Sequence, residues 1–285
     1  MKKDILSGFT GKMEEVLEGL SLIVDLLMSK AFQDRDAVQT LLDVLIPEYC
    51  FTVLETRTQV EAGDLAHRNV RFDILAIDKY GRRVNIEMQR SKDGFSPKRI
   101  RYNMAILDGL ALEKGMDVKN IPDNFVICIT AWDPFGEGLP IYHRRGRIDE
   151  TGAPCENGAH EIYVNGAWRG DDALGRLMSD LHSLTSQGMH YPALANVVHR
   201  FKETEEGRME MYEGMKDFAQ ELTKYVRSEV TKEVQFTIAK SMIEDGSNPI
   251  EKIAQWLDLS LSDVEALQKE CEAEAAEHHK CHLEA

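Results

Sequence analysis

The stretch from residue 70 to residue 90 constrains the fold most, because it predicts a β-hairpin with acidic side chains on one face. It reads V-R-F-D-I-L-A-I-D-K-Y-G-R-R-V-N-I-E-M-Q-R. Two runs of alternating apolar and polar residues flank D-K-Y-G, a turn signal that contains glycine. A reversal centred on Tyr80 pairs residues whose numbers sum to 160. Asp73 and Glu87 are then opposite each other, with Cβ atoms about 5 Å apart.

Because strand side chains alternate with a period of two, each strand of the hairpin has two predicted faces. In the first strand one face carries Val70, Phe72, Ile74 and Ala76, and the other carries Arg71, Asp73, Leu75 and Ile77. In the second strand Val84, Ile86 and Met88 share one face, and the opposite face carries Asn85, Glu87 and Gln89. A shift of the register by one residue would separate Asp73 from Glu87.

Two facing carboxylates in strands rich in Val, Ile and Leu repel each other unless a cation lies between them. Mg²⁺ binds one or two protein carboxylates and keeps water for the rest of its shell, so Asp73 and Glu87 are candidate ligands. The alternative is that the acids belong to a solvated strand face and only keep it soluble. The hairpin alone leaves both interpretations open.

A helix with a basic first turn is predicted directly after the hairpin. Ser96 suits the N-cap, Pro97 the first helical position and Gly115 the C-terminal cap. The predicted buried stripe consists of Ile100, Met104, Leu107 and Ala111. Positive side chains near a helix N-terminus oppose the helix dipole, which favours a functional explanation over a solvated basic face. The basic side chains of this segment are Arg90, Lys92, Lys98, Arg99 and Arg101.

The remaining pattern up to residue 170 predicts the order helix, three strands, helix, strand. Helices are expected within residues 13–49, a strand over 51–60, and a strand buried on both faces over 124–130. Short strands are expected at 141–143 and 161–165, among many turn signals. The basic run H-R-R-G-R at 143–147 is typical of solvated surface.

The composition changes near residue 200, where Glu, Lys and Met become frequent. The steps of four and three between Met211, Met215, Phe218, Leu222 and Tyr225 predict a helix that packs on the body or pairs with a second copy. Residues 249–270 resemble a small helix-turn-helix, with Ser260 and Asp263 spaced as a capping box. Its acidic second helix argues against direct reading of DNA. We therefore predict one domain at 1–200, a helical extension at 201–245 and a small, acidic, helix-turn-helix-like tail at 246–285.

Charge and cysteine content limit the function further. The net charge of -15 means that contact with DNA requires a local basic patch. Five scattered cysteines without C-x-x-C spacing predict reduced thiols in a cytoplasm. No apolar run approaches the roughly 20 residues that span a bilayer. The crowded Cys271, His278, His279, Cys281 and His282 lack the paired spacing of a structural zinc site.

Taken in order, these motifs resemble the PD-(D/E)xK nuclease superfamily, and within it the Rpn-like nuclease-family transposase group. The motifs that carry the resemblance are R-x-D at Arg71–Asp73, E-x-Q-R at Glu87–Arg90 and R-x-R-Y at Arg99–Tyr102. T-Q-V at Thr58–Val60 and I-Y-V-N-G at Ile162–Gly166 add to it, so that the similarity covers about residues 20 to 210. The resemblance implies an α/β fold with a restriction-endonuclease-like core and a long helical C-terminal extension.

The resemblance also implies a function, a Mg²⁺- or Mn²⁺-dependent DNA endonuclease. Asp73 and Glu87 would hold the metal, and Arg90, Lys98, Arg99, Arg101 and Tyr102 would contact the DNA backbone. The third catalytic residue of the superfamily is usually Lys, whereas this chain has Gln89. An amide can bind a water or a phosphate oxygen but brings no positive charge.

Two other functions stay open at this stage. A nuclease-fold protein with little or no activity could bind DNA or a protein partner, or form a homo-oligomer through the helical tail. A transposase with a different acidic triad would need another carboxylate beside Asp73, and the spacing singles none out, although Glu55 and Asp64 are near in sequence.

Overall fold

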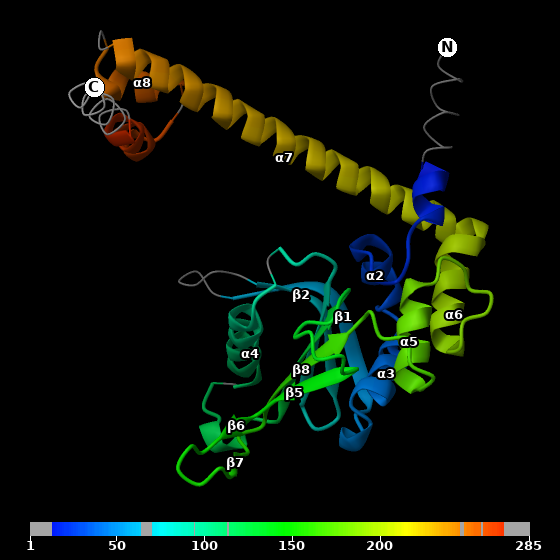
Figure 1. Ribbon diagram of the computed structural model, residues 1–285. Coiled ribbons are helices and arrows are strands. Elements are labelled where there is room, and N and C mark those ends of the chain that lie inside the picture. Colours follow the sequence, from blue (N-terminus) through cyan, green and yellow to red (C-terminus); the bar gives the residue numbers. More distant parts are fainter. Residues whose placement is uncertain are drawn as a thin grey trace, which may run out of the picture. The chain divides into compact units, whose positions relative to one another are not determined.

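The computed structural model describes residues 13–63, 70–93, 95–112, 114–245, 248–257 and 259–270 (Figure 1). The chain divides into two compact units, Met1–Met215 and Lys216–Ala285. The first unit is built on a six-stranded mixed sheet of order β1-β2-β3-β4-β8-β5. Its strands are β1 (Val53–Ala62), β2 (Val70–Asp78), β3 (Arg83–Gln89), β4 (Asn124–Thr130), β8 (Ala159–Asn165) and β5 (Ile141–Arg144). A separate two-stranded hairpin is formed by β6 (Gly146–Arg147) and β7 (Pro154–Cys155).

Helices cover both faces of the six-stranded sheet (Figure 1). One face packs against α2 (Asp25–Ala31), α3 (Arg35–Leu45), α5 (Ala173–His182) and α6 (Pro192–Val198). The other face packs against α4 (Pro97–Ala111), whose Ile100, Met104 and Leu107 contact Val126 and Tyr163. The short helical turns are η1 (Pro47–Tyr49), η2 (Val118–Asn120) and η3 (His199–Glu203). This arrangement confirms the predicted α/β class and restriction-endonuclease-like core.

The connections explain why α4 lies where it does. Strands β1, β2 and β3 form an antiparallel meander, whereas β3, β4 and β8 are parallel. A parallel pair needs a crossover, and α4 makes the crossover between β3 and β4. The helix therefore runs back along the sheet, antiparallel to β3. Its N-terminus lies near the end of β3 that carries Glu87 and Gln89.

The register predicted for the β2–β3 hairpin is confirmed. Ile74 pairs with Ile86 and Leu75 with Asn85, so the residue numbers sum to 160. The Asp78 carboxylate closes the turn by accepting from the backbone N–H groups of Tyr80 and Arg82 at 2.8 and 3.0 Å. Gly81 follows with φ +78°, a conformation that glycine adopts without strain.

The predicted alternation along β2 is wrong on the N-terminal side of Asp73. Ile74 and Ala76 belong to the core beneath α2 and α3, whereas Val70 and Phe72 pack on the α4 side with Leu75. The partner strand switches faces at the same point, because Gln59 has φ +52°. A left-handed residue in a strand rotates the chain and breaks the period of two. Asp73 therefore lies at the point where the β1–β2 ribbon switches faces.

The N-terminal helices lie within the predicted range of 13–49, since the chain is helical over 13–18 and again from α2 onward. One other helix boundary differs from the prediction. Helix α4 ends at Ala111 with Leu112 as its C-cap, so Gly115 is not the cap. The predicted start is correct, since the Ser96 side chain accepts from the N–H of Lys98.

In the C-terminal region α7 extends over Glu205–Asp245. Met211 and Met215 are buried in the core of the first unit. The side chains of Phe218, Leu222 and Tyr225 lie outside the described residues, and so does the Cys/His cluster after residue 270. The predicted boundaries at 200 and 245 therefore stay predictions, as does oligomerisation through the tail.

The second unit contains a small helical core. Helix α8 (Ile250–Leu257) and a helix over residues 261–270 pack around Ala239, Ile253 and Val264. Ser260 caps the second of these helices, because its hydroxyl accepts from the N–H of Asp263 at 3.1 Å. Within the described residues, no helix is long and apolar enough to cross a membrane.

We expect Gln59→Gly to leave stability unchanged or to raise it by about 1 kcal/mol, because a side chain with positive φ costs that much or more. The matched control is Glu61→Gly in the same strand, which should lose about 1 kcal/mol through added chain entropy. Urea unfolding of both variants measures the difference. An equal loss in the two variants would contradict the strain assigned to Gln59.

Candidate active site

The end of the β2–β3 pairing brings Asp73 and Glu87 together. Backbone pairing runs from Ile77 and Arg83 to Ile74 and Ile86. At the next position, the N–H of Met88 donates to Asp73 Oδ2 at 3.0 Å, and the charge of Asp73 acts on Glu87. The two acids are thus adjacent.

Glu87 is a buried carboxylate, and in the part of the chain that the structure describes it has two side-chain partners. It is 4% exposed, and its Oε1 accepts from Asn85 Nδ2 at 2.9 Å. Its Oε2 lies 3.5 Å from a guanidinium nitrogen of Arg99. Burial, followed by the charge of Asp73, raises the pKa of Glu87 to about 7 despite these favourable contacts. Near neutral pH the side chain exchanges its proton readily.

The pKa of Asp73 is raised as well, first by burial. The bond from Met88 N–H opposes the shift, as do the charges of Arg99 and Arg71, whereas the charge of Asp25 adds to it. Because the pKa values of both carboxylates are raised, nearby positive charge would favour the loss of their protons. A divalent cation between them would supply it.

Asp25 was not predicted from the sequence as part of this site. It is the first residue of α2, its carboxylate is 3.8 Å from Arg90, and its charge reaches Asp73. An acid in the first turn of a helix is common, so the sequence contains no signal for its tertiary position. Of the acids considered earlier, Glu55 pairs with Arg57 on the exposed part of β1, and Asp64 lies outside the described residues.

Gln89 lies on the same strand as Glu87, two residues further on. Its Nε2 donates to the backbone oxygens of Ser91 and Asp93 at 2.8 and 3.1 Å. The amide therefore holds the loop that leads into α4. A role in orienting a water molecule stays a prediction.

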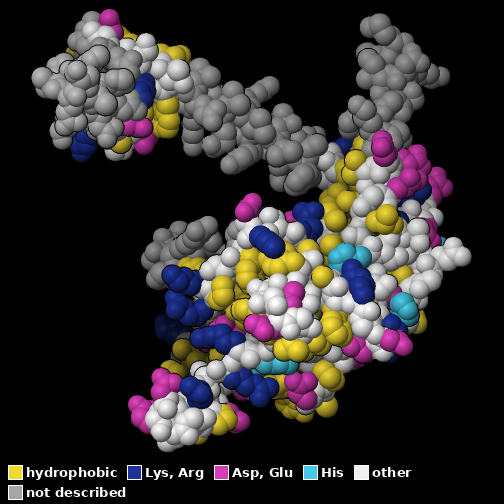
Figure 2. All heavy atoms as spheres, viewed as in Figure 1, with side chains coloured by type: hydrophobic (Ala, Val, Ile, Leu, Met, Phe, Trp, Pro, Cys, Tyr) yellow, Lys and Arg dark blue, Asp and Glu magenta, His cyan; other side chains and the backbone are white. Residues whose placement is uncertain are grey.

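The predicted basic residues fall into two groups. Arg99 and Arg90 face the acids, since Arg99 is next to Glu87 and Arg90 next to Asp25. Lys98 and Arg101 are exposed on α4, and Tyr102 is half-buried. Figure 2 shows Lys and Arg side chains gathered over the part of the surface where α4 lies. Their contact with DNA stays a prediction.

Two buried amides lie deeper along the same interface. Among the described side chains, Asn85 Oδ1 and both polar atoms of Asn103 have no hydrogen-bond partner. Asn103 follows Arg99 by one helical turn along α4, and Asn85 precedes Glu87 by two positions along β3. Because α4 is antiparallel to β3, both amides are displaced from the Arg99–Glu87 contact in the same direction along the sheet. A buried amide without a partner is costly, so this region is suited to binding water or another polar species.

Cys128 forms part of the floor beside the acids. It is the backbone partner of Glu87 on β4 and is 2% exposed. Burial, followed by the charge of Glu87, raises the pKa of its thiol to about 12. The thiol is therefore protonated at neutral pH.

These residues fit a hard divalent cation in chemical type. Two carboxylates, a nearby amide and unpartnered amide oxygen are the oxygen ligands that Mg²⁺ and Mn²⁺ accept. Within the described ranges, no group of three or more His, Cys, Asp or Glu side chains could hold a metal.

Comparison with known families identifies the segment that contains this site. Residues 26–148 match the PD-(D/E)XK nuclease family transposase family. The match includes Asp73, Glu87, Gln89 and all of α4. It confirms the predicted resemblance over these residues. Comparisons with curated proteins and with solved structures each found no match.

The raised pKa of Glu87 predicts that cation binding weakens in acid. Protons compete with the cation for Glu87 below pH 7, so Mn²⁺ affinity should fall roughly fourfold between pH 8 and pH 6.5. Calorimetric titration with Mn²⁺ measures this change. In Glu87→Gln the residual affinity should be independent of pH over this range, and an unchanged pH dependence would contradict the assignment.

Stability without metal should depend on pH in the opposite sense to that of an ordinary acid. The pKa of Glu87 in the folded protein exceeds its ordinary value of 4.5. The contribution of Glu87 to the free energy of unfolding is therefore complete below pH 4.5 and is lost as pH rises through 7. Above pH 8, Glu87→Gln should be more stable than the unmodified protein by about 3 kcal/mol, and at pH 5 the two should be nearly equal. Urea unfolding in EDTA tests this, and a gap that widens toward pH 5 would contradict it.

Proposed function

We propose that this chain, whose residues 26–148 belong to the PD-(D/E)XK nuclease family transposases, is a metal-dependent DNA endonuclease. The observation that carries the proposal is the Asp73–Glu87 pair, two adjacent carboxylates with raised pKa values at the end of a β-hairpin. A purely structural pair would be better replaced by apolar residues, because burial of two like charges is unfavourable. The family match supports nuclease chemistry at these positions.

In this proposal Asp73 and Glu87 hold Mg²⁺ or Mn²⁺. When bound, such a cation would polarise the scissile phosphate and lower the pKa of a bound water molecule. Asn85 orients Glu87 through its 2.9 Å bond, and the Met88 N–H orients Asp73 through its 3.0 Å bond. Both carboxylates must lose their protons before they can act as ligands.

Arg99 is the residue best placed to compensate for the missing Lys. Gln89 brings no charge, whereas the Arg99 guanidinium is 3.5 Å from Glu87 and half-exposed. A guanidinium can donate to a carboxylate and to a phosphate from the same planar group. We infer that Arg99 stabilises the negative charge that develops on the phosphate.

The exposed basic residues of α4 position the DNA backbone. Lys98 and Arg101 are in the first turns of the helix and are free to contact phosphates. Such contacts fix orientation but carry no sequence information. A local patch is required because the whole chain has a net charge of -15.

A second function is favoured by one specific observation. Gln89 Nε2 already donates to the backbone oxygens of residues 91 and 93, so in this conformation it does not serve as a donor toward a phosphate in place of the Lys usual in the superfamily. This favours a nuclease-fold protein that binds DNA or a partner without cutting. Metal-dependent cleavage separates the two functions.

The test is cleavage of supercoiled DNA with Mg²⁺ or Mn²⁺. Glu87→Gln and Asp73→Asn should each reduce the rate by about 100-fold or more while the melting temperature shows a folded protein. Glu55→Gln, an exposed acid on β1, should retain full activity. Equal trace cleavage by the unmodified protein and both site variants would identify a contaminant and reject the nuclease.

A further inference from the structure

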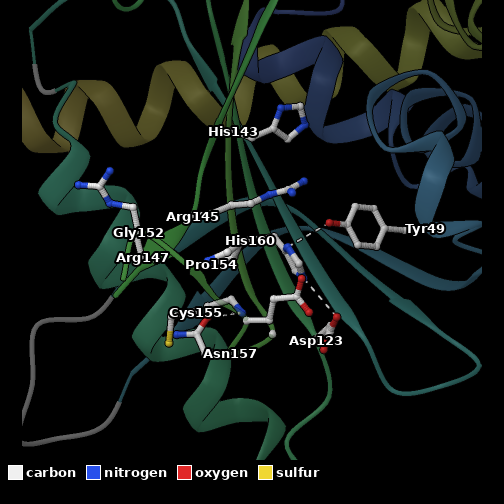
Figure 3. A pocket seen from close by; sticks show the side chains of 14 residues that line it. Tyr49, Asp123, His143, Arg145, Arg147, Gly152, Pro154, Cys155, Asn157 and His160 are labelled. Atoms are coloured by element: carbon white, nitrogen blue, oxygen red, sulfur yellow. Dashed lines mark hydrogen bonds and ion pairs between the residues drawn. The ribbon is translucent and has the colours of Figure 1, made fainter. Parts of the chain in front are cut away.

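A second site, remote from the acids, is suggested by a cavity of about 760 Å³ at the edge of the sheet where β4 and β8 begin (Figure 3). Tyr49, Asp123 and His160 line it together with the β6–β7 hairpin. Asp123 precedes Cys128, the partner of Glu87, by five strand positions, which corresponds to about 16 Å along β4. The cavity is therefore not part of the candidate active site.

One wall of the cavity is a fixed chain of hydrogen bonds. Tyr49 Oη is 3.1 Å from His160 Nδ1, and His160 Nε2 is 3.2 Å from Asp123 Oδ2. A carboxylate accepts only, so His160 Nε2 donates to Asp123, and in that tautomer Nδ1 accepts from the tyrosine hydroxyl. The Tyr49 oxygen can still accept a hydrogen bond from a ligand in the cavity. Stacking of His160 on Phe125, with centroids 4.5 Å apart, fixes the ring.

Arg145 is the unbalanced cation of this cavity. Its neighbours in the basic run are paired, Arg144 with Glu161 at 2.5 Å and Arg147 with Asp149 at 3.8 Å. Among the described residues Arg145 makes no ion pair or hydrogen bond. Figure 3 shows its side chain reaching between His143 and Tyr49, with Asp123 beyond His160.

The groups that face Arg145 are uncharged at neutral pH. Burial, then the charge of Arg145, lowers the pKa of His143, so its ring is neutral. Burial raises the pKa of Tyr49 while Arg145 opposes the shift, so the hydroxyl keeps its proton. The carboxylate of Glu48 acts on both groups, and those of Asp123 and Glu156 act on Tyr49. None of these acids forms an ion pair with Arg145.

The other end of the cavity is lined by two carboxylate side chains. Asp123 and Glu156 line it, and Gly158 makes room for Asp123, since a Cβ at Gly158 would be 2.8 Å from Asp123 Oδ1. Carboxylates accept hydrogen bonds from hydroxyl or amino groups. A ligand that suits both ends has an anionic group for the guanidinium and neutral donors for the acids.

We propose that this cavity binds a nucleoside phosphate, with the phosphate on Arg145. The sugar hydroxyls or the amino group of the base donate to Asp123, Glu156 and the Tyr49 oxygen. Guanidinium groups bind phosphate oxygens in a fork geometry, and the volume is in the range of small-molecule sites. The nucleoside phosphate is either a free nucleotide or the terminal nucleotide of a strand. This proposal does not depend on nuclease activity.

The test is calorimetric titration of the full chain with AMP in EDTA, where metal-dependent cleavage is silent. AMP should bind saturably, and more tightly than inorganic phosphate or adenosine alone. Arg145→Ala should weaken AMP binding roughly 10-fold or more, as expected for loss of a charged hydrogen bond. Arg57→Ala, an exposed ion-paired arginine on β1, is the matched control and should bind as the unmodified protein does.

Tyr49→Phe provides the second variant, because it keeps the ring that packs edge-on against Phe125 and removes only the hydroxyl. This variant should weaken AMP binding severalfold. It tests the proposed site on its own if Arg145→Ala does not fold. Competition by an oligonucleotide with a 5′-phosphate, but not by its unphosphorylated form, assigns the site to strand ends. AMP binding without such competition assigns it to free nucleotides.

Two outcomes would overturn the proposal. One is no saturable AMP binding at millimolar concentration, and the other is unchanged affinity in both Arg145→Ala and Tyr49→Phe. Glu87→Gln should bind AMP normally. The proposed AMP site and the proposed nuclease activity can therefore fail independently, because DNA cleavage alone tests the nuclease.

Discussion

The burial of the Glu87 carboxylate between β3 and α4 is the interaction on which the candidate active site depends. A carboxylate that is 4% exposed can stay charged only if its neighbours compensate for lost hydration. Asn85 and Arg99 do so in part, and the adjacent Asp73 works against them. The strands and the helix around Glu87 hold these three side chains close to its carboxylate. The β2–β3 pairing sets the distance to Asp73, and the crossover helix brings Arg99 to the same point.

Helix α4 links the acidic pair to the candidate DNA surface. Its start is fixed by the Ser96 cap and by the Gln89 amide, which holds the preceding loop. One side of its first turns faces Glu87 through Arg99, and the other exposes Lys98 and Arg101. A change in the loop would therefore alter the charge around Glu87 and the orientation of the basic surface together. In this chain Gln89 has a structural task, because its Nε2 donates to the backbone oxygens of Ser91 and Asp93.

The sequence allowed the hairpin, its register and the basic helix to be predicted, because these follow from local periodicity and capping. Asp73 and Glu87 followed directly from that register. The face switch at Gln59 could not be predicted, since glutamine has no preference for positive φ. Asp25 reaches the site through packing of α2, which local patterns do not encode. Arg145 was expected to be ordinary solvated surface, and only the fold places it beside Tyr49 and the start of β8.

The burial of Cys128 has a consequence for its own reactivity. A thiol reacts as the thiolate, and a side chain with a pKa of about 12 keeps its proton at neutral pH. The burial that raises the pKa of Glu87 also raises the pKa of this thiol, its partner on β4. Without a bound metal, the cysteine should therefore resist alkylation and oxidation although it lies directly beside the acidic pair.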